Sequence, residues 1–254
     1  MNHEIPSLKI DRFKKIINTI NSNKRLSLSQ LEKLLDVSRI TIQRDLVELE
    51  NRKLLRRFHG GAMSLEYSKD LYDHDLKKSV NIAAKKIIAA KAASLIKEGH
   101  YIGLDSSSTV YYLSETIFAG NVFVFTCCID SFKNLLNRDD IQVVLAGGRM
   151  NKKTHTLSGP EIIEMIRKFR FDMAFISAES YIPEIGFYDP HAEEVQVKRA
   201  LIESSNKTVM LIDSSKIAAT SNGIKICDLQ EIDLVVTDKP EKSGLKNIFK
   251  EKII

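Results

Sequence analysis

Three short polar runs beyond residue 100 carry groups that could bind a charged small molecule. Residues 105–109 (DSSST) offer a carboxylate and four hydroxyls. Residues 147–149 (GGR) offer a guanidinium and a glycine backbone that a ligand can approach closely, and residues 213–216 (DSSK) offer an amine. Hydroxyls and backbone N–H groups at a helix start, joined by arginine or lysine, are suited to phosphate. Each run alone is more often a helix cap or a turn, so the prediction of a phosphorylated ligand rests on the three coming together.

A second set of candidate residues lies in the first quarter of the chain. Residues 1–62 contain 13 Lys and Arg against 7 Asp and Glu, a net charge of +6, whereas residues 63–254 contain 25 against 26, a net charge of −1. A basic segment beside a nearly neutral remainder favours an anionic polymer as the partner of the first. A solvated basic surface is the alternative.

The apolar spacing in the basic segment predicts three helices and a hairpin. Residues 10–20 form the first helix and 30–35 the second, while the third begins at its cap Ser38 and ends near residue 51. The apolar residues expected to be buried are Ile10, Phe13, Ile17, Ile20, Leu31, Leu34, Leu35, Ile42, Leu46 and Leu49. A short helix, a turn and a helix with a polar outer face form a helix-turn-helix, whose last helix lies in the major groove.

The third helix and the hairpin at residues 54–61 carry the side chains predicted to contact DNA. Arg44 and Gln43 can form paired hydrogen bonds to guanine and adenine, and Ile40 can pack on a thymine methyl group. The other predicted DNA-binding residues are Ser38, Arg39, Thr41, Arg56, Arg57 and His59. A three-helix structural cap with a solvated polar face is the alternative.

Residues 27–62 resemble the N-terminal winged helix-turn-helix of the DeoR family of bacterial transcription regulators. The motifs VS..TI.RDL..LE and R.HGGA both occur at the family's spacing. Three positions depart from the family pattern. Gln43 occupies a position where the family has Arg, Glu32 one where it has Ala, and Asp36 one where it has Gly. We expect Gln43 to alter the base preference at one position and Asp36 to adopt the left-handed turn conformation at some cost.

Beyond a polar stretch at 63–79, predicted as a linker, strand-like and helical segments alternate. An Ala-rich helix is expected over 80–98, ended by Gly99. The expected strands are 101–105, 122–126, 141–148, 171–177, 208–213 and 232–238, with helices near 109–118, 131–137, 160–168 and 193–205. This pattern predicts an α/β domain over 80–254 with a mostly parallel sheet covered on both faces. Ligands bind at the carboxyl ends of such strands, where the polar runs lie.

The resemblance to DeoR regulators extends over residues 9–240, through IA..A..LI..G..I.LD..ST, EE..VKRA and DSSK in the family's order. It implies a sensor domain similar in fold to ribose-5-phosphate isomerase that binds a phosphorylated sugar. The implied effector-binding residues are Asp105, Ser107, Ser108, Thr109, Thr126, Gly148, Arg149, Glu179, Glu194, Lys198 and Lys216. Ser107 and Ser177 stand where the family has Gly, and Glu179 where it has Asp. A backbone turn at Ser107 that needs a positive φ would be strained.

The sequence favours a regulator over an enzyme. An isomerase needs a carboxylate base beside the sugar carbonyl, and Ile176 stands where the related enzymes have the first of two acids. Glu194 and Lys198 leave open a sugar-phosphate isomerase with a DNA-binding appendage, although an i, i+4 ion pair on a helix surface would explain them equally well. A degenerate sensor that only dimerises is a third possibility.

The remaining expectations concern surroundings and partners. No apolar run is long enough to span a membrane, the N-terminus lacks a signal peptide's apolar region, and the three cysteines suggest buried thiols in a reducing cytoplasm. We expect no metal and no cofactor. A double-stranded DNA operator is the predicted partner, read by a dimer or tetramer because a dimer contacts two half-sites.

Overall fold

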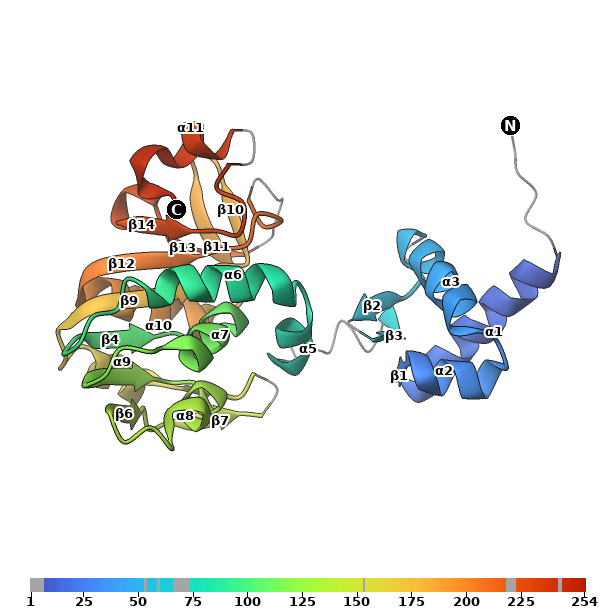
Figure 1. Cartoon of the computed structure of the whole chain (residues 1–254), viewed down its shortest axis with the longest axis horizontal. Coiled ribbons are helices and arrows are strands. Elements are labelled where there is room, and N and C mark those ends of the chain that lie inside the picture. The colour runs from blue at the N-terminus through green and yellow to red at the C-terminus, as the bar shows by residue number, and fades with distance from the viewer. Residues whose placement is uncertain are drawn as a thin grey trace. The chain divides into compact units, whose positions relative to one another are not determined.

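The computed structural model describes residues 7–52, 54–58, 60–65, 74–152, 154–217, 223–241 and 244–254. The chain divides into two compact units, Met1–Val80 and Asn81–Ile254 (Figure 1). The stretch predicted as a linker is partly regular structure. Met63 is the last residue of a strand, and helix α5 spans His74–Ser79.

The first unit packs three helices against a small antiparallel sheet of order β1–β3–β2. Its elements are α1 (Ser7–Asn23), β1 (Arg25–Ser27), α2 (Leu28–Leu35), α3 (Arg39–Asn51), β2 (Arg56–Phe58) and β3 (Gly61–Met63). The hairpin β2–β3 is present as predicted. Strand β1 was not predicted, because three residues are too few to display an alternating pattern.

The buried face of α1 differs from the predicted one. Phe13, Ile16 and Ile20 are buried, whereas Ile10 is 40% exposed and Ile17 is only partly buried. Residues spaced by three and four lie on one helical face, so Ile16 occupies its centre and Ile10 its edge. In α2, Leu34 is likewise exposed, because the helix begins at Leu28 and turns Leu28, Leu31 and Leu35 inward.

Both ends of α2 are fixed by local hydrogen bonds. The Ser27 hydroxyl accepts from the Gln30 backbone N–H, and the Gln30 side chain accepts from the Ser27 backbone N–H, which forms a capping box. At the other end Asp36 adopts the left-handed conformation, with φ 53° and ψ 46°, as expected. These two caps set the angle at which the chain turns into α3.

The second unit is built on a six-stranded parallel sheet of order β14–β12–β9–β4–β5–β6. Its strands are β4 (Tyr101–Leu104), β5 (Val122–Thr126), β6 (Ile141–Leu145), β9 (Phe171–Ser177), β12 (Ser205–Leu211) and β14 (Leu234–Val236), which correspond to the six predicted strands. Successive strands β4, β5 and β6 run to one side, and β9, β12 and β14 to the other. The strand order therefore reverses between β4 and β9, the point where doubly wound sheets open a ligand crevice.

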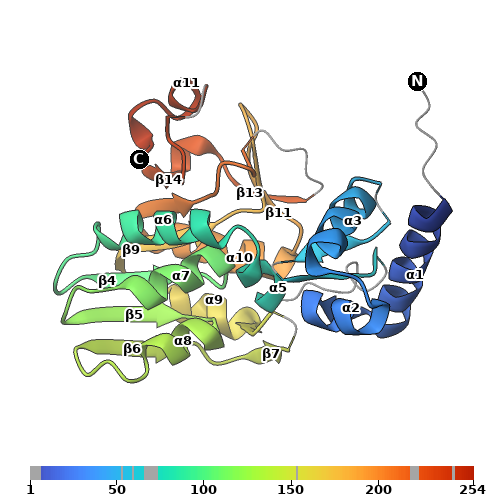
Figure 2. The ribbon, with the colours of Figure 1, turned by 45° about the vertical axis from the view of Figure 1, so that its right-hand side comes forward.

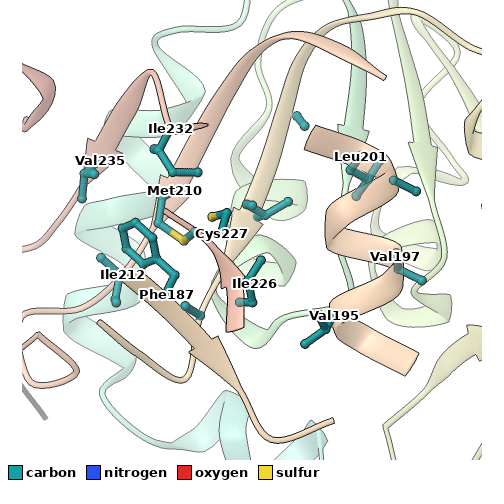
Figure 3. Packing of buried hydrophobic residues seen from close by; sticks show 14 of the residues in the cluster. Phe187, Val195, Val197, Leu201, Met210, Ile212, Ile226, Cys227, Ile232 and Val235 are labelled. Carbon is teal, nitrogen blue, oxygen red and sulfur yellow. The ribbon is translucent and has the colours of Figure 1, made fainter. Parts of the chain in front are cut away.

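Helices cover both faces of this sheet (Figure 2). The helices are α6 (Ile82–Ala93), α7 (Ser108–Thr116), α8 (Ile129–Leu135), α9 (Pro160–Ile166) and α10 (Ala192–Glu203). Helices α6, α7 and α8 share one apolar core, and α9 and α10 share the other. In β9, Ala174 and Ile176 enter the α9–α10 core while Phe175 enters the opposite one. Figure 3 shows Val195, Val197 and Leu201 of α10 on one side of the α9–α10 core and Met210 of β12 on the other, with Ile226 and Cys227 of the chain between them.

Several shorter elements were not predicted. They are the hairpin β7 (Arg149–Asn151) and β8 (Thr156–Ser158), the small sheet β10 (Ser180–Ile182), β11 (Gly186–Asp189) and β13 (Ile224–Cys227), helix α11 (Leu245–Phe249), and the 3-10 turns η1 (Leu229–Glu231) and η2 (Lys250–Lys252). Helix α6 ends at Ala93, so Gly99 is not its cap, although its φ is +77°. None of the described helices is long and apolar enough to cross a membrane.

Candidate functional site

The outward face of α3 carries most of the side chains predicted to contact DNA. Ser38, Arg39, Gln43 and Arg44 are exposed, and Ile40 is 63% exposed. The inward face buries the predicted apolar residues Ile42, Leu46 and Leu49. Ser38 lies at the N-cap position of α3, but its hydroxyl is 3.0 Å from the Thr41 hydroxyl and caps no backbone N–H. Both hydroxyls therefore sit together at the start of the helix.

All three carboxylates of α3 are paired with cations. Asp45 is bound by the Arg12 guanidinium, and Glu48 accepts from Lys9 and Arg52 at 2.6 Å each. The hydrogen bond from Lys9, with a smaller one from Arg52, lowers the pKa of Glu48 despite an opposing desolvation effect. Among the described residues, Arg39 and Arg44 have no such ion pair. The cations on the outer face of α3 are thus available to an external anion.

Glu50 binds the wing, which we define as the three-stranded sheet of residues 25–27 and 56–63. The Arg57 backbone N–H donates to the Glu50 carboxylate at 2.8 Å, and the Arg57 guanidinium lies 3.9 Å from it. A cleft of 210 Å³ separates α3 from the wing. It is lined by Leu28, Arg39, Gln43, Leu46, Arg57, Phe58, Gly60 and Gly61. Arg56 is exposed, and His59 lies outside the described residues.

In the second unit, Asp105 lies at the reversal of strand order and binds three groups. One carboxylate oxygen accepts from the Ser177 backbone N–H at 2.8 Å and from the Lys198 amine at 2.7 Å. The other accepts from the Ser107 backbone N–H at 2.8 Å. Asp105 is fully buried, so it fastens the end of β4 to the end of β9 instead of offering a free carboxylate.

Lys198 forms the centre of a buried charge cluster that consists of Asp105, Asp189, Glu194 and Lys198. Its amine lies 3.9 Å from both Asp189 and Glu194. Burial lowers the pKa of Lys198, but the three carboxylates together outweigh burial and raise that pKa above its ordinary value. The interpretation of Glu194 and Lys198 as a surface ion pair is wrong, because the Lys198 side chain is only 2% exposed.

Glu194 connects this cluster to a cavity. Its carboxylate accepts from the Ser106 hydroxyl and, at 3.3 Å, from the Thr156 hydroxyl of β8. The cavity has a volume of 390 Å³. Its lining residues are Asn151, Thr154, Thr156, Ser158, Pro190, His191, Ala192, Glu193, Glu194 and Val197. Hydroxyl and carboxylate groups therefore dominate its polar lining.

The strain expected at Ser107 does not exist. Ser107 has φ −71° and ψ 152°, and its hydroxyl accepts from the Val110 backbone N–H as the N-cap of α7. Serine performs this capping role well, so no glycine is needed. Ser108 and Thr109, in the first turn of α7, are buried.

The other predicted effector residues fall into two groups. Arg149 pairs with Glu193 at 3.0 Å, and Lys216 donates to Glu179 at 3.4 Å, in side chains that are at least partly exposed. Thr126 and Gly148 have internal roles. The Thr126 hydroxyl accepts from the Cys128 backbone N–H, and a Cβ on Gly148, whose φ is +144°, would meet the Ser158 carbonyl at 2.9 Å.

Sequence reasoning missed several members of the site. Asp189 and Thr156 lie on β11 and β8, which were not predicted, and Ser106 was not singled out within its run. Asn81 donates to Asp213 and Ser215 at 3.3 Å each, which connects the start of α6 to the loop after β12. An Asp-Pro-His turn before a helix was the one signal for Asp189 in the sequence.

Two family models match the chain. Residues 12–68 match the DeoR-like helix-turn-helix domain, and residues 80–239 match the DeoR C terminal sensor domain. The chain belongs to the DeoR family.

Curated DeoR-type relatives match nearly the whole chain. The HTH-type transcriptional regulator GolR of Listeria innocua is 31% identical over 95% of this chain and 95% of its own. The transcriptional repressor GlcR of Bacillus subtilis is 31% identical over 90% and 88%, and the L-fucose operon activator of Haemophilus influenzae is 31% identical over 91% and 92%. This chain is therefore a DNA-binding transcriptional regulator.

Among solved structures, ribose 5-phosphate isomerase A of Methanocaldococcus jannaschii matches 52% of this chain and 53% of its own, with 20% identity and a TM-score of 0.37. The eIF2B delta subunit of Chaetomium thermophilum matches 91% and 71%, with 13% identity and a TM-score of 0.45.

The DeoR-family regulator is not an enzyme of the isomerase type. Ile176, at the position where an acid was considered, is fully buried in the apolar core beside α10. The relatives of matching length are named as regulators of transcription. The helix-turn-helix binds DNA, and the α/β unit is its sensor domain.

Proposed function

We propose that this regulator represses a sugar-metabolism operon in the cytoplasm, and that a phosphorylated sugar bound in its sensor domain controls its affinity for a double-stranded DNA operator. The observation that carries the proposal is the cavity of 390 Å³ whose polar lining reaches the buried charge cluster through Glu194. Sugar hydroxyls pair well with carboxylates and hydroxyls, since they both donate and accept. The names of relatives add support: one is a lactose phosphotransferase system repressor and another an L-fucose operon activator.

The charges of the site suggest how such a ligand would be oriented. The cavity lining contains Glu193 and Glu194 and, among the described residues, no lysine or arginine. A phosphate there would be repelled, so the sugar hydroxyls belong in the cavity. The phosphate belongs beside Ser107, Ser108 and Thr109, where the positive end of the α7 dipole favours an anion.

Control of DNA binding requires that the effector bind two states of the protein with different affinities. Glu194 is the residue through which this difference would arise. A ligand that reaches the loop after β4 must replace the hydrogen bonds that Ser106 and Thr156 donate to the Glu194 carboxylate. Arg149 and Lys216, already paired with Glu193 and Glu179, supply cations that could transfer to the phosphate. We further propose a homodimer or tetramer, since a dimer reads two half-sites.

On the DNA side, we propose that Arg44, Gln43 and Ile40 read base edges, because they project from the outer face of α3. Backbone phosphates would be contacted by Ser38, Arg39, Thr41, Arg56 and Arg57. Gln43 and Arg39 both line the cleft beside the wing, which a DNA strand would cross.

A thermal-shift series tests the proposal. Pentose and hexose phosphates are each compared with the unphosphorylated sugar and with inorganic phosphate, on the native protein and on Glu194→Gln. We expect at least one phosphosugar to raise the melting temperature of the native protein, its free sugar to have little effect, and Glu194→Gln to weaken the response. If every phosphosugar leaves the melting temperature unchanged, that result contradicts the proposed effector and favours a sensor that only dimerises. Turnover of a phosphosugar in a coupled spectrophotometric assay would contradict a regulator-only role.

A further inference from the structure

The wing contains a cation–aromatic pair that the helix-turn-helix motif does not account for. The Arg25 guanidinium of β1 stacks over the Phe58 ring of β2, with 4.2 Å from the guanidinium carbon to the ring centroid. The two strands are not neighbours, because β3 lies between them. The pair therefore spans the full width of the three-stranded sheet.

Gly61 of β3 makes this pair possible. In the antiparallel register Gly61 lies opposite Ser27 of β1 and opposite Phe58 of β2. A Cβ on Gly61 would meet the Leu26 carbonyl oxygen at 2.2 Å and the tip of the Phe58 ring at 2.5 Å, so the β1 backbone and the ring together occupy the space that a side chain would fill. Without that side chain, Phe58 lies across β3 and presents its face to Arg25.

Arg25 differs from its neighbours in how its charge is balanced. Arg12 is bound by Asp45, Arg52 by Glu48, and Arg57 by Glu50. Arg25 has no ion pair among the described residues, and only the ring holds it. A guanidinium that stacks on a ring still directs its N–H donors outward in its own plane, where they can bind phosphate oxygens.

The ring that holds Arg25 also borders the cleft beside α3. Phe58 lines the 210 Å³ cleft that Arg39 and Gln43 line from α3. One aromatic ring thus has the cleft beside it and the Arg25 guanidinium over its face.

We propose that Arg25, held by Phe58 across Gly61, is a DNA-binding residue of the wing and contacts a backbone phosphate. Because phosphates carry no base sequence, this contact adds affinity equally on every duplex and makes binding more sensitive to salt.

The test measures binding of a fluorescein-labelled random-sequence duplex by anisotropy across a series of salt concentrations. We expect Arg25→Gln to weaken binding by roughly fivefold to tenfold at about 100 mM salt and to reduce the slope of log affinity against log salt by about one. The matched control Lys97→Gln removes one positive charge from the sensor unit, where Lys97 is exposed, and should leave the slope unchanged.

A structural role for the pair would produce another pattern. Arg25→Gln would then lower the melting temperature while the salt slope stayed at the native value, and that result overturns the proposal. Phe58→Leu provides a second check. If the ring positions the guanidinium, Phe58→Leu should weaken DNA binding in the native background and have little further effect on affinity in the Arg25→Gln background. Equal losses in both backgrounds would also contradict the proposal.

Discussion

With the exception of the buried Asp45 carboxylate, the described ion pairs of the DNA-reading unit join side chains that water still reaches, whereas those at the centre of the sensor are sealed from it. Glu48 and Lys9 retain about a third of their exposure, at 32% and 33%, while Asp105 and Lys198 retain 0% and 2%. Exposed pairs contribute little to stability, because water screens them and the long side chains lose entropy. A buried pair is different, since removing one partner leaves a charge without compensation.

This difference matches the two tasks. The reading helix needs free cations on its outer face, and its three carboxylates are neutralised by cations from α1, from Arg52 directly after α3, and from the wing. In the sensor, the charges hold together the ends of β4, β9, β11 and the helix α10. Charge in the first unit is directed at a partner, and charge in the second maintains the shape of a crevice.

The largest expected effect comes from emptying the centre of the buried charge cluster. Lys198→Met leaves Asp105 buried without its cation, and we expect the sensor unit to lose about 3 to 5 kcal/mol of unfolding free energy. Lys216→Met, which breaks the partly exposed pair with Glu179, is the matched control and should cost less than about 1 kcal/mol. Urea unfolding of each variant, followed by the intrinsic fluorescence of the sensor unit, measures both losses of unfolding free energy. Similar losses in the two variants would contradict the contrast between sealed and water-exposed ion pairs.

A smaller effect is expected at the reading surface. Arg44→Ala should leave folding intact, because the side chain is exposed. If Arg44 binds a guanine through two hydrogen bonds, the variant loses about 1 to 3 kcal/mol of discrimination at one base position. Competition binding between a selected operator and its single-base variants measures this. Equal weakening on operator and random DNA would mean that Arg44 contacts phosphate. Arg52→Ala, already paired with Glu48, is the control and should not change base preference.

The exposed pairs of α3 can be tested through Glu48. Glu48→Gln removes the negative charge that pairs with Lys9 and Arg52, and we expect a loss below about 1 kcal/mol at neutral pH. The pKa of Glu48 is lowered in the folded state, so the stabilisation is present above the unfolded pKa and disappears as pH falls through the folded one. Melting temperatures of the native protein and the variant should therefore converge on acidification. A gap that persists at low pH would show that the contacts are not ionic.

The smallest signal concerns the thiols, all of which lie in the sensor and are buried. Burial raises the pKa of Cys127 and Cys128, and that of Cys227 to about 12. Because thiolates are the reactive form, we expect no modification of the native protein by a disulfide reagent at pH 8 and full modification in urea. Because the thiols lose their protons more easily in the unfolded state, the free energy of unfolding should decline as pH rises above the unfolded thiol pKa. Rapid labelling of the native protein would indicate that the core opens locally.

The parts of the fold that could be predicted are those with long local patterns. The strands β5 and β9 are almost continuous apolar runs, as expected for parallel strands buried on both faces. Strands β1, β7, β8 and β10 have three residues each and show no period. Strand β1 forms because of a partner distant in the sequence, β3, whereas β7 and β10 pair with β8 and β11 in short hairpins.

The candidate site was predictable by residue type and less so by role. Asp105 and Lys198 were both expected at the ligand, yet the structure shows them bound to one another across 93 positions of sequence. Asp105 also accepts from a backbone N–H 72 positions away. No local pattern encodes such pairings. The predicted strain at Ser107 was wrong for a similar reason, because the turn there is a helix cap that serine favours.

The contacts of Glu194 bear on the redesign of this protein as a biosensor. Glu194 is held by two neutral hydroxyls, those of Ser106 and Thr156, and neither belongs to the charges around Lys198. If the cavity binds the effector as proposed, a library that varies these two hydroxyl residues should change its ligand preference while Asp105 and Lys198 keep the strand ends in register. If a library also varied Asp105 or Lys198, we expect most of its variants to be unfolded.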